Sequence, residues 1–171
     1  MITVTTEKGG TNDRLKLRAA FAKKLNKVIA GVDGIAKTGK NEKQNYHYAE
    51  EAEVVKHVRK ALVDAGLSFE VEVEHREWTH EITARSGSVH RLCEVLLICE
   101  LTDTDTGYTR TYRWLGDGLD PGDKAIYKAY TSGVKYFLMK NFLLPTGDDV
   151  EAAPDVEPAK TEAKTNTKPH P

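Results

Sequence analysis

Apolar residues recur at helical spacing in three separate segments of the chain. In residues 12–30 and 49–65 they fall three and four positions apart, which places them on one face of a helix. The second segment stops at Gly66, a residue that commonly closes a helix. The third segment, residues 122–143, keeps the same period without a gap. The pattern predicts three amphipathic helices, the first two joined by a polar, lysine-bearing loop.

Between the second and third helices the period changes to two, which is typical of strands. Residues 68–78 alternate apolar and acidic side chains, and residues 79–88 form a polar connection. Residues 89–101 are apolar enough to predict a strand covered on both faces. After the turn Asp103-Thr104-Asp105-Thr106-Gly107, residues 108–115 return as a third strand. We expect an α+β fold, a three-stranded antiparallel β-meander packed with helices.

Composition divides the chain into one globular region with two polar ends. Of the 171 residues 39% are hydrophobic and 30% charged, which is typical of a single globular core. We expect a disordered N-terminus over residues 1–11, a domain over 12–147 and a disordered acidic tail over 148–171. The chain lacks a signal-peptide pattern and an apolar run of membrane-spanning length, so we expect a cytoplasmic protein. Cys93 and Cys99 share the parity of the apolar residues around them, which predicts buried thiols.

The segment Gly116-Asp117-Gly118-Leu119-Asp120-Pro121-Gly122-Asp123-Lys124-Ala125 leads into the third helix. Asp120 suits the N-cap, Pro121 the first helical position and Asp123 the third, so we expect this turn to cap the helix. Gly116 and Gly118 predict unusual backbone angles. Carboxylates at a helix start repel a phosphate there, so any polyanion should lie along the side of the helix.

A row of cations follows on that helix. Lys124, Lys128, Thr131 and Lys135 fall at i, i+4, i+7 and i+11, with Tyr127 beside them. No acidic residue lies between Lys124 and Asn141. Helix surfaces usually mix charges, so unpaired aligned lysines suggest an external anion such as a nucleic acid. The alternative is a solvated surface, or one paired with the glutamates of the first strand.

Further cations and aromatic residues lie in two other segments. Arg110 shares a strand face with three aromatic residues, either covering the core or lining a groove with Arg113 at its rim. In the first loop, tyrosines beside lysines suit stacking on unpaired bases, although one ring of such a pair commonly packs in the core. The loop candidates are Lys37, Lys40, Lys43, Tyr46 and Tyr48.

The sequence gives less support to an enzymatic function. Asp117, Asp120 and Asp123 could bind magnesium for phosphodiester cleavage, but no further acid is clearly placed beside them. The histidines and cysteines lack zinc spacing, and no Walker box, dinucleotide fingerprint or nucleophile elbow is present. We therefore expect a binding protein without a cofactor, with a nuclease and a non-catalytic host-factor interaction module as alternatives.

With these residues in view, the chain resembles the essential recombination function (ERF) family of phage single-strand annealing proteins. The resemblance rests on Tyr46-His47-Tyr48, Ala65-Gly66-Leu67, the turn ending at Gly107, the segment from Gly116 to Tyr136, and Pro145-Thr146-Gly147-Asp148-Asp149. It implies a β-β-β-α core that binds single-stranded DNA and anneals complementary strands without ATP. It also implies rings or filaments, a host bacterial cytoplasm, and an exonuclease or host single-strand-binding protein as partner. The short tail leaves the role of a longer C-terminal region open.

Overall fold

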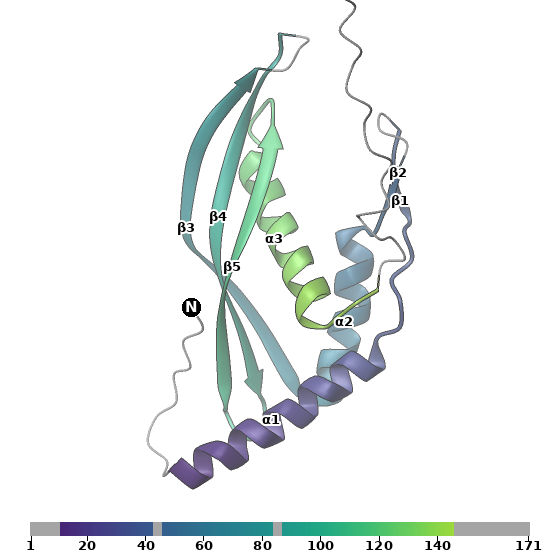
Figure 1. Ribbon diagram of the computed structural model, residues 1–171, viewed down its shortest axis with the longest axis vertical. Coiled ribbons are helices and arrows are strands. Elements are labelled where there is room, and N and C mark those ends of the chain that lie inside the picture. The colour runs from purple at the N-terminus through teal and green to yellow at the C-terminus, as the bar shows by residue number, and fades with distance from the viewer. Residues whose placement is uncertain (1–10, 43–45, 84–86, 146–171) are drawn as a thin grey trace, which may run out of the picture.

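The computed structural model describes residues 11–42, 46–83 and 87–145 of the chain. It is an α+β fold in which a three-stranded antiparallel sheet packs against helices (Figure 1), as the sequence predicts. The predictions for residues 1–10 and 146–171 lie outside the described part, and so does Lys43. None of the described helices is long and apolar enough to cross a membrane.

All three predicted helices are present. They are α1 (Thr11–Gly31), α2 (Glu51–Ala65) and α3 (Ala125–Asn141). Gly66 ends α2 with a φ of 67°, a left-handed conformation in which glycine meets no Cβ penalty. The predicted cap of the third helix is wrong, because α3 begins later, after Lys124, and no side chain caps it. Asp120 instead accepts a hydrogen bond from the Gly122 amide at 2.8 Å, which closes the turn before the helix.

The sheet is built from β3 (Leu67–Thr83), β4 (Val89–Asp103) and β5 (Thr109–Asp120) in that spatial order. Two strands are longer than predicted. β3 continues through most of the predicted loop, because register shifts at 73/75 and 78/80 break the alternation that the sequence pattern relies on. β5 runs on through Gly116 to Asp120. A small hairpin, β1 (Gly39–Asn41) with β2 (Tyr46–Tyr48), lies within the segment predicted as a loop.

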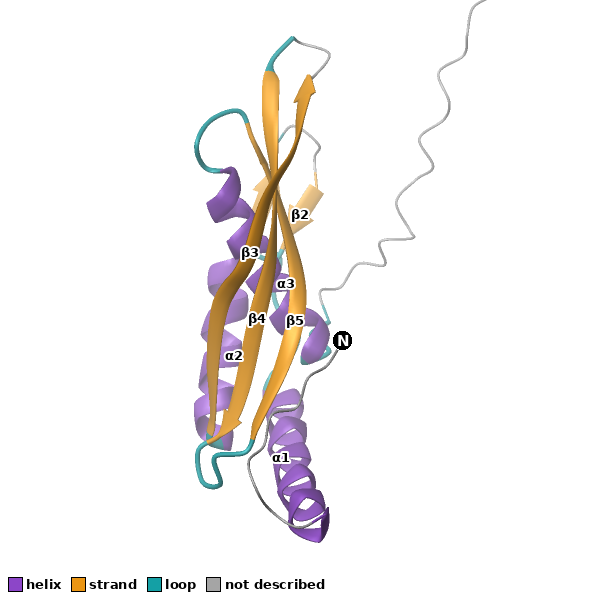
Figure 2. Ribbon diagram, turned by 90° about the vertical axis from the view of Figure 1, so that its left-hand side faces the viewer, coloured by secondary structure: helices purple, strands orange, loops and turns teal. Residues whose placement is uncertain are grey.

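The helices cover one face of the sheet. Figure 2 shows α2 and α3 behind the strands, and β4 buries alternate residues from Cys93 to Leu101 on that side. The other face, which we call the outer face, is not covered by any helix or strand that the structure describes. The prediction that β4 is covered on both faces is therefore wrong. Its outward leucines are only half-buried, which an antiparallel sheet with one open face tolerates.

Two glycines of β5 set the distance between sheet and helix. A Cβ on Gly116 would lie 2.3 Å from the Ala129 carbonyl oxygen, and one on Gly118 would lie 2.3 Å from the Ala125 carbonyl oxygen. The predicted unusual backbone angles are wrong, since neither glycine has a positive φ. Glycine is required here because α3 packs directly on the strand backbone.

Two contacts fix α1 across the end of the sheet. Phe21 packs on Tyr108, with ring centroids 5.3 Å apart. Lys24 Nζ lies 2.5 Å from Asp103 Oδ1, at the end of β4, and 2.7 Å from Asp105 Oδ2, in the turn that follows. Burial alone would raise the pKa of Asp103, but hydrogen bonds from Lys24 and the turn lower it overall. These contacts hold α1 from its middle onward, while residues 12–19 of the helix have no buried side chain.

Candidate nucleic-acid interface

The predicted lysine row lies on the outward side of α3. Lys124 precedes the first turn and is exposed, as are Thr131 and Tyr127, the latter to 73%. Within the described part of the chain, the Lys124 ammonium makes no ion pair. These side chains occupy the solvent-facing positions that the helical period predicts.

Lys128 departs from the prediction of an unpaired row. Its Nζ lies 2.5 Å from Asp120 Oδ2 and 3.1 Å from the Leu119 carbonyl oxygen. The hydrogen bond from Lys128 is the largest cause that lowers the pKa of Asp120. The pair forms because β5 extends to Asp120 and α3 packs on Gly118, so the helix passes beside the end of the strand. Lys128 therefore has a protein counter-ion.

Lys135 lies among aromatic rings. Its Nζ is 5.8 Å from the ring centroid of Tyr48 and 4.7 Å from that of Tyr136, within range of a cation–π interaction. The β1–β2 hairpin thus brings the predicted Tyr48 beside the predicted Lys135, although 87 residues separate them in the chain. Tyr48 is 38% exposed and Tyr136 45% exposed, so each ring keeps part of its surface open. The side chain of Tyr46 lies outside the described set.

The remaining predicted cations are dispersed. Lys40 pairs with Glu42 at 3.1 Å, and Lys37 is half-buried. Arg110 lies on the helix side of β5, with its guanidinium 5.0 Å from the Tyr112 ring centroid. Arg113 lies on the outer face, where two hydrogen bonds of 3.0 Å and 2.8 Å join it to Glu74. The arginine therefore does not border a groove under the helix, and its charge is matched by a carboxylate.

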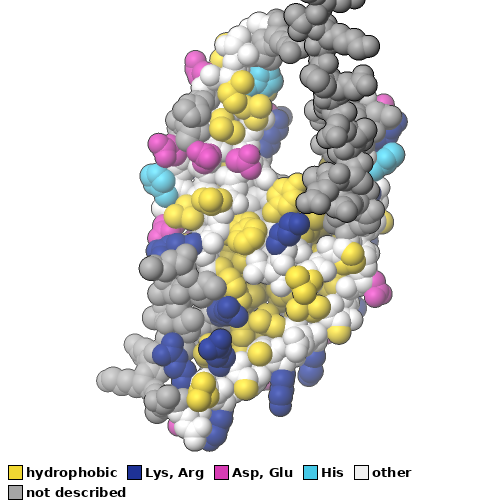
Figure 3. Space-filling model, in the orientation of Figure 1, with side chains coloured by type: hydrophobic (Ala, Val, Ile, Leu, Met, Phe, Trp, Pro, Cys, Tyr) yellow, Lys and Arg dark blue, Asp and Glu magenta, His cyan; other side chains and the backbone are white. Residues whose placement is uncertain are grey.

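Sequence reasoning missed the most cationic element, which is α1. This helix has six lysines and arginines and one acid, Asp13. Lys16 pairs with that acid, and Lys24 pairs with the β4–β5 turn. The other cations make no ion pair within the described part of the chain: Arg14, Arg18, Lys23 and Lys27. The signal was available, because no acid lies between Asp13 and Asp33. In Figure 3 the lysines and arginines gather toward the end of the molecule that holds α1.

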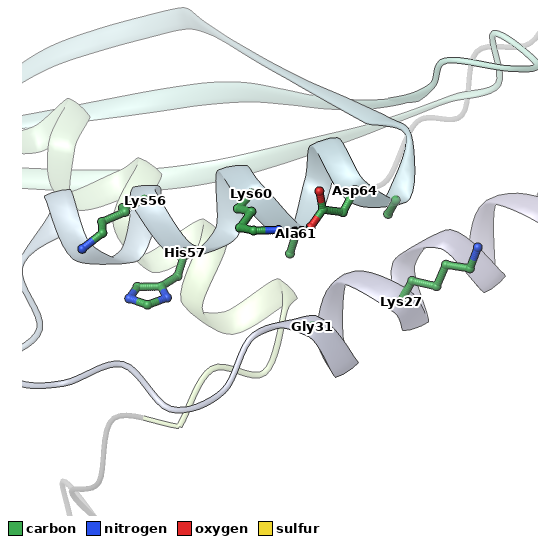
Figure 4. A pocket seen from close by; sticks show the side chains of 8 residues that line it. Lys27, Gly31, Lys56, His57, Lys60, Ala61 and Asp64 are labelled. Carbon is green, nitrogen blue, oxygen red and sulfur yellow. Dashed lines mark hydrogen bonds and ion pairs between the residues drawn. The ribbon is translucent and has the colours of Figure 1, made fainter.

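A recess of about 330 Å³ separates the end of α1 from α2 (Figure 4). Lys27 borders it from α1, and Lys56, His57 and Lys60 border it from α2. The cations of α2 are matched within their own helix, since Lys56 and His57 contact Glu53 while Lys60 contacts Asp64. Of these four side chains, only Lys27 adds a cation without a described carboxylate partner.

The outer face of the sheet has the opposite charge. The strand register puts Glu77, Glu94 and Asp117 side by side across all three strands, and Glu70 opposite Glu100. Figure 3 shows acidic side chains over the end of the sheet far from α1. Such a surface repels a polyanion.

The three aspartates of the nuclease alternative do not converge. Asp117 lies on the outer face, Asp120 lies on the helix side against Lys128, and Asp123 is exposed in the turn before α3. Among the described residues, no three histidine, cysteine or acidic side chains are arranged to hold a metal ion.

Comparison with known proteins gives one match. The sequence model described as the ERF superfamily matches residues 21–171, which is most of the chain. The match includes α2, the whole sheet and α3, and it begins at Phe21, the first buried residue of α1. No curated protein matches the chain.

Proposed function

Because the chain belongs to the ERF superfamily, a family of phage recombination proteins, we propose that it binds single-stranded DNA and anneals complementary strands without ATP. The observation that carries the proposal is the separation of charge. Four cations of α1 have no carboxylate partner among the described residues, and α3 has exposed tyrosines beside lysines. Both features lie apart from a sheet face that is rich in carboxylates. Lysines and arginines neutralise phosphates, and aromatic rings stack on unpaired bases without sequence preference.

Annealing requires phosphates to be neutralised while the base edges stay reachable. Along α3, Lys124 and Lys135 would contact the backbone, and Tyr127 and Tyr48 would offer stacking surfaces. Lys128 would contribute only when a phosphate displaces Asp120. Arg18, Lys23 and Lys27 of α1 would add further phosphate contacts. Each subunit makes few contacts, so several subunits on one strand would supply the affinity.

The test is a titration of a fluorescent single-stranded oligonucleotide over a range of salt concentrations. The affinity K falls as salt rises, so the slope of log K against log salt is negative. Each lost phosphate contact should reduce the magnitude of this slope by about 0.7. We expect Arg18→Ala/Lys23→Ala/Lys27→Ala to lower it by up to about 2. Lys124→Ala/Lys135→Ala should lower it by up to about 1.4. The matched control, Lys56→Ala/Lys60→Ala, removes lysines that already have acidic partners and should change the slope least.

An annealing assay with two complementary labelled strands then tests the activity itself. We expect duplex formation to be accelerated without nucleotide, and the α1 variant to lose most of that acceleration. Absence of oligonucleotide binding at 0.1 M salt would instead favour an interaction module. Magnesium-dependent shortening of the labelled strand would favour the nuclease.

A further inference from the structure

The sequence that follows the described part of the chain begins with a run of acidic residues. Residues 146–159 contain five acids and no lysine, arginine or histidine. The acids are Asp148, Asp149, Glu151, Asp155 and Glu157. Like charges so close together repel one another, so residues 148–157, which we call the acidic segment, are stabilised by any cationic surface within their reach.

The last described residue, Pro145, shows where this segment leaves the fold. Its carbonyl oxygen accepts a hydrogen bond from the Ile35 amide at 3.2 Å. Ile35 follows Gly31, the last residue of α1, by only four positions, so the chain leaves the fold near the C-terminal end of α1 (Figure 1). Three residues span at most about 11 Å, so the acidic segment begins within that distance of Pro145.

Within the described part of the chain, α1 offers a matching row of cations. Arg14, Arg18, Lys23 and Lys27 are exposed, and none of them has a carboxylate partner among the described residues. From Lys27 back to Arg14 the helix spans about 20 Å at 1.5 Å per residue. The ten residues of the acidic segment span about 30 Å when extended, so they can follow the helix over this whole length.

Other described surfaces suit the acidic segment less. The Lys56 and Lys60 side chains of α2 pair with acids of their own helix, and Lys128 of α3 pairs with Asp120. Lys124 lies at the far end of α3, about 25 Å along a helix of 17 residues. The outer face of the sheet carries carboxylates and repels the segment. Position and charge therefore both favour α1.

We propose that the acidic segment docks along α1 of its own subunit and competes with a phosphate backbone for the cations of this helix. The docking needs no DNA, whereas the competition rests on the proposed function. A bound strand displaces the segment, so the segment lowers the affinity for DNA without contacting it. If about two thirds of the molecules hold the segment docked, about one third can bind, and the affinity is about threefold weaker.

Carbodiimide cross-linking of the full chain tests the docking without DNA, because this reagent joins a lysine amine to a carboxylate that touches it. In low salt we expect Lys23 and Lys27 to be joined to acids of residues 148–157. These products should disappear at 1 M salt, where the Debye length is about 3 Å. A mixture of isotope-labelled and unlabelled chains identifies links within one subunit, because both linked peptides then carry the same isotope.

Three cross-linking results would overturn the docking. They are the absence of links to α1, links that join different chains, and links that go mainly to the lysines of α3.

The oligonucleotide titration tests the competition. The segment variant replaces the five acids by amides: Asp148→Asn/Asp149→Asn/Glu151→Gln/Asp155→Asn/Glu157→Gln. At 0.1 M salt it should bind about threefold more tightly than the wild type, and the gain should disappear toward 1 M salt. The matched control changes the net charge equally on the outer face and should give a smaller gain: Glu70→Gln/Glu72→Gln/Glu77→Gln/Glu94→Gln/Asp117→Asn.

Combining the segment variant with Arg18→Ala/Lys23→Ala/Lys27→Ala shows where the segment acts. The gain should vanish in this background, because the surface that the segment covers has been removed. A gain of full size there, or an equal gain from the outer-face control, would contradict the competition. A wild-type chain that binds no oligonucleotide would contradict the proposed function instead, and the cross-links would still decide the docking.

Discussion

Replacing Asp120 with asparagine removes the ion pair that Lys128, a residue of the predicted lysine row, makes with its neighbouring carboxylate. The Lys128 side chain is 52% exposed and Asp120 is 11% exposed, so the pair lies at the surface and a phosphate can approach the ammonium. Asparagine keeps a side-chain oxygen that can accept the Gly122 amide, which Asp120 Oδ1 now accepts at 2.8 Å. The substitution therefore removes the negative charge while it preserves the turn.

If Lys128 is then available to a phosphate, one more contact adds about 0.7 to the salt slope for single-stranded DNA. With no other energy counted, affinity at 0.1 M salt rises by a factor of ten to the power 0.7, about fivefold, and the gain disappears toward 1 M salt. The assay is the same oligonucleotide titration at four or five salt concentrations. Asp120→Asn/Lys128→Ala is the control, and it should show neither the steeper slope nor the gain.

An Asp120→Asn protein that melts like wild type but binds with unchanged or lower affinity at all salt concentrations would refute the reasoning. It would mean that DNA does not pass along this side of α3. The nuclease alternative predicts a different result for the same variant, namely loss of a magnesium-dependent cleavage that the wild type shows.

Three further predictions concern the fold. Asp103→Asn should lower the free energy of unfolding in urea at pH 7 by about 2 kcal/mol, because the charge-assisted hydrogen bond between Lys24 and this fully buried carboxylate is replaced by a weaker one to a neutral amide. The pKa of Asp103 is lowered in the folded state, so its carboxylate stabilises the fold above the ordinary carboxyl pKa, and this stabilisation is lost as pH falls below about 4. The free energy of unfolding of the variant should therefore fall less steeply with decreasing pH than that of the wild type. Gly118→Ala should cost at least about 2 kcal/mol by the same urea assay, because its Cβ would overlap the backbone of α3, whereas Gly34→Ala, whose Cβ would come no nearer than 3.6 Å to Pro145, should be nearly neutral. Burial raises the pKa of Cys99 to about 12, so at pH 8 a thiol reagent should modify it only after denaturant is added.

Local patterns were enough to predict the elements that the fold is made of. The helical period placed α1, α2 and α3, and Gly66 correctly marked the end of α2. The alternating residues placed the three strands and their order, because short polar turns join sequential antiparallel neighbours. The extension of β3 could not be predicted, since its register shifts disturb the alternation and depend on pairing with β4.

For the candidate site too, some features could be predicted from the sequence and others depended on the tertiary structure. The sequence by itself determined that Lys124, Lys128 and Lys135 share one side of α3, because helical spacing is a local property. It also contained the excess of cations on α1, which needed only to be counted. Only the tertiary structure decided which charges remain available to a ligand. Pairs such as Arg113 with Glu74 join residues from different strands, and their formation depends on register and packing distance rather than on neighbours in the chain.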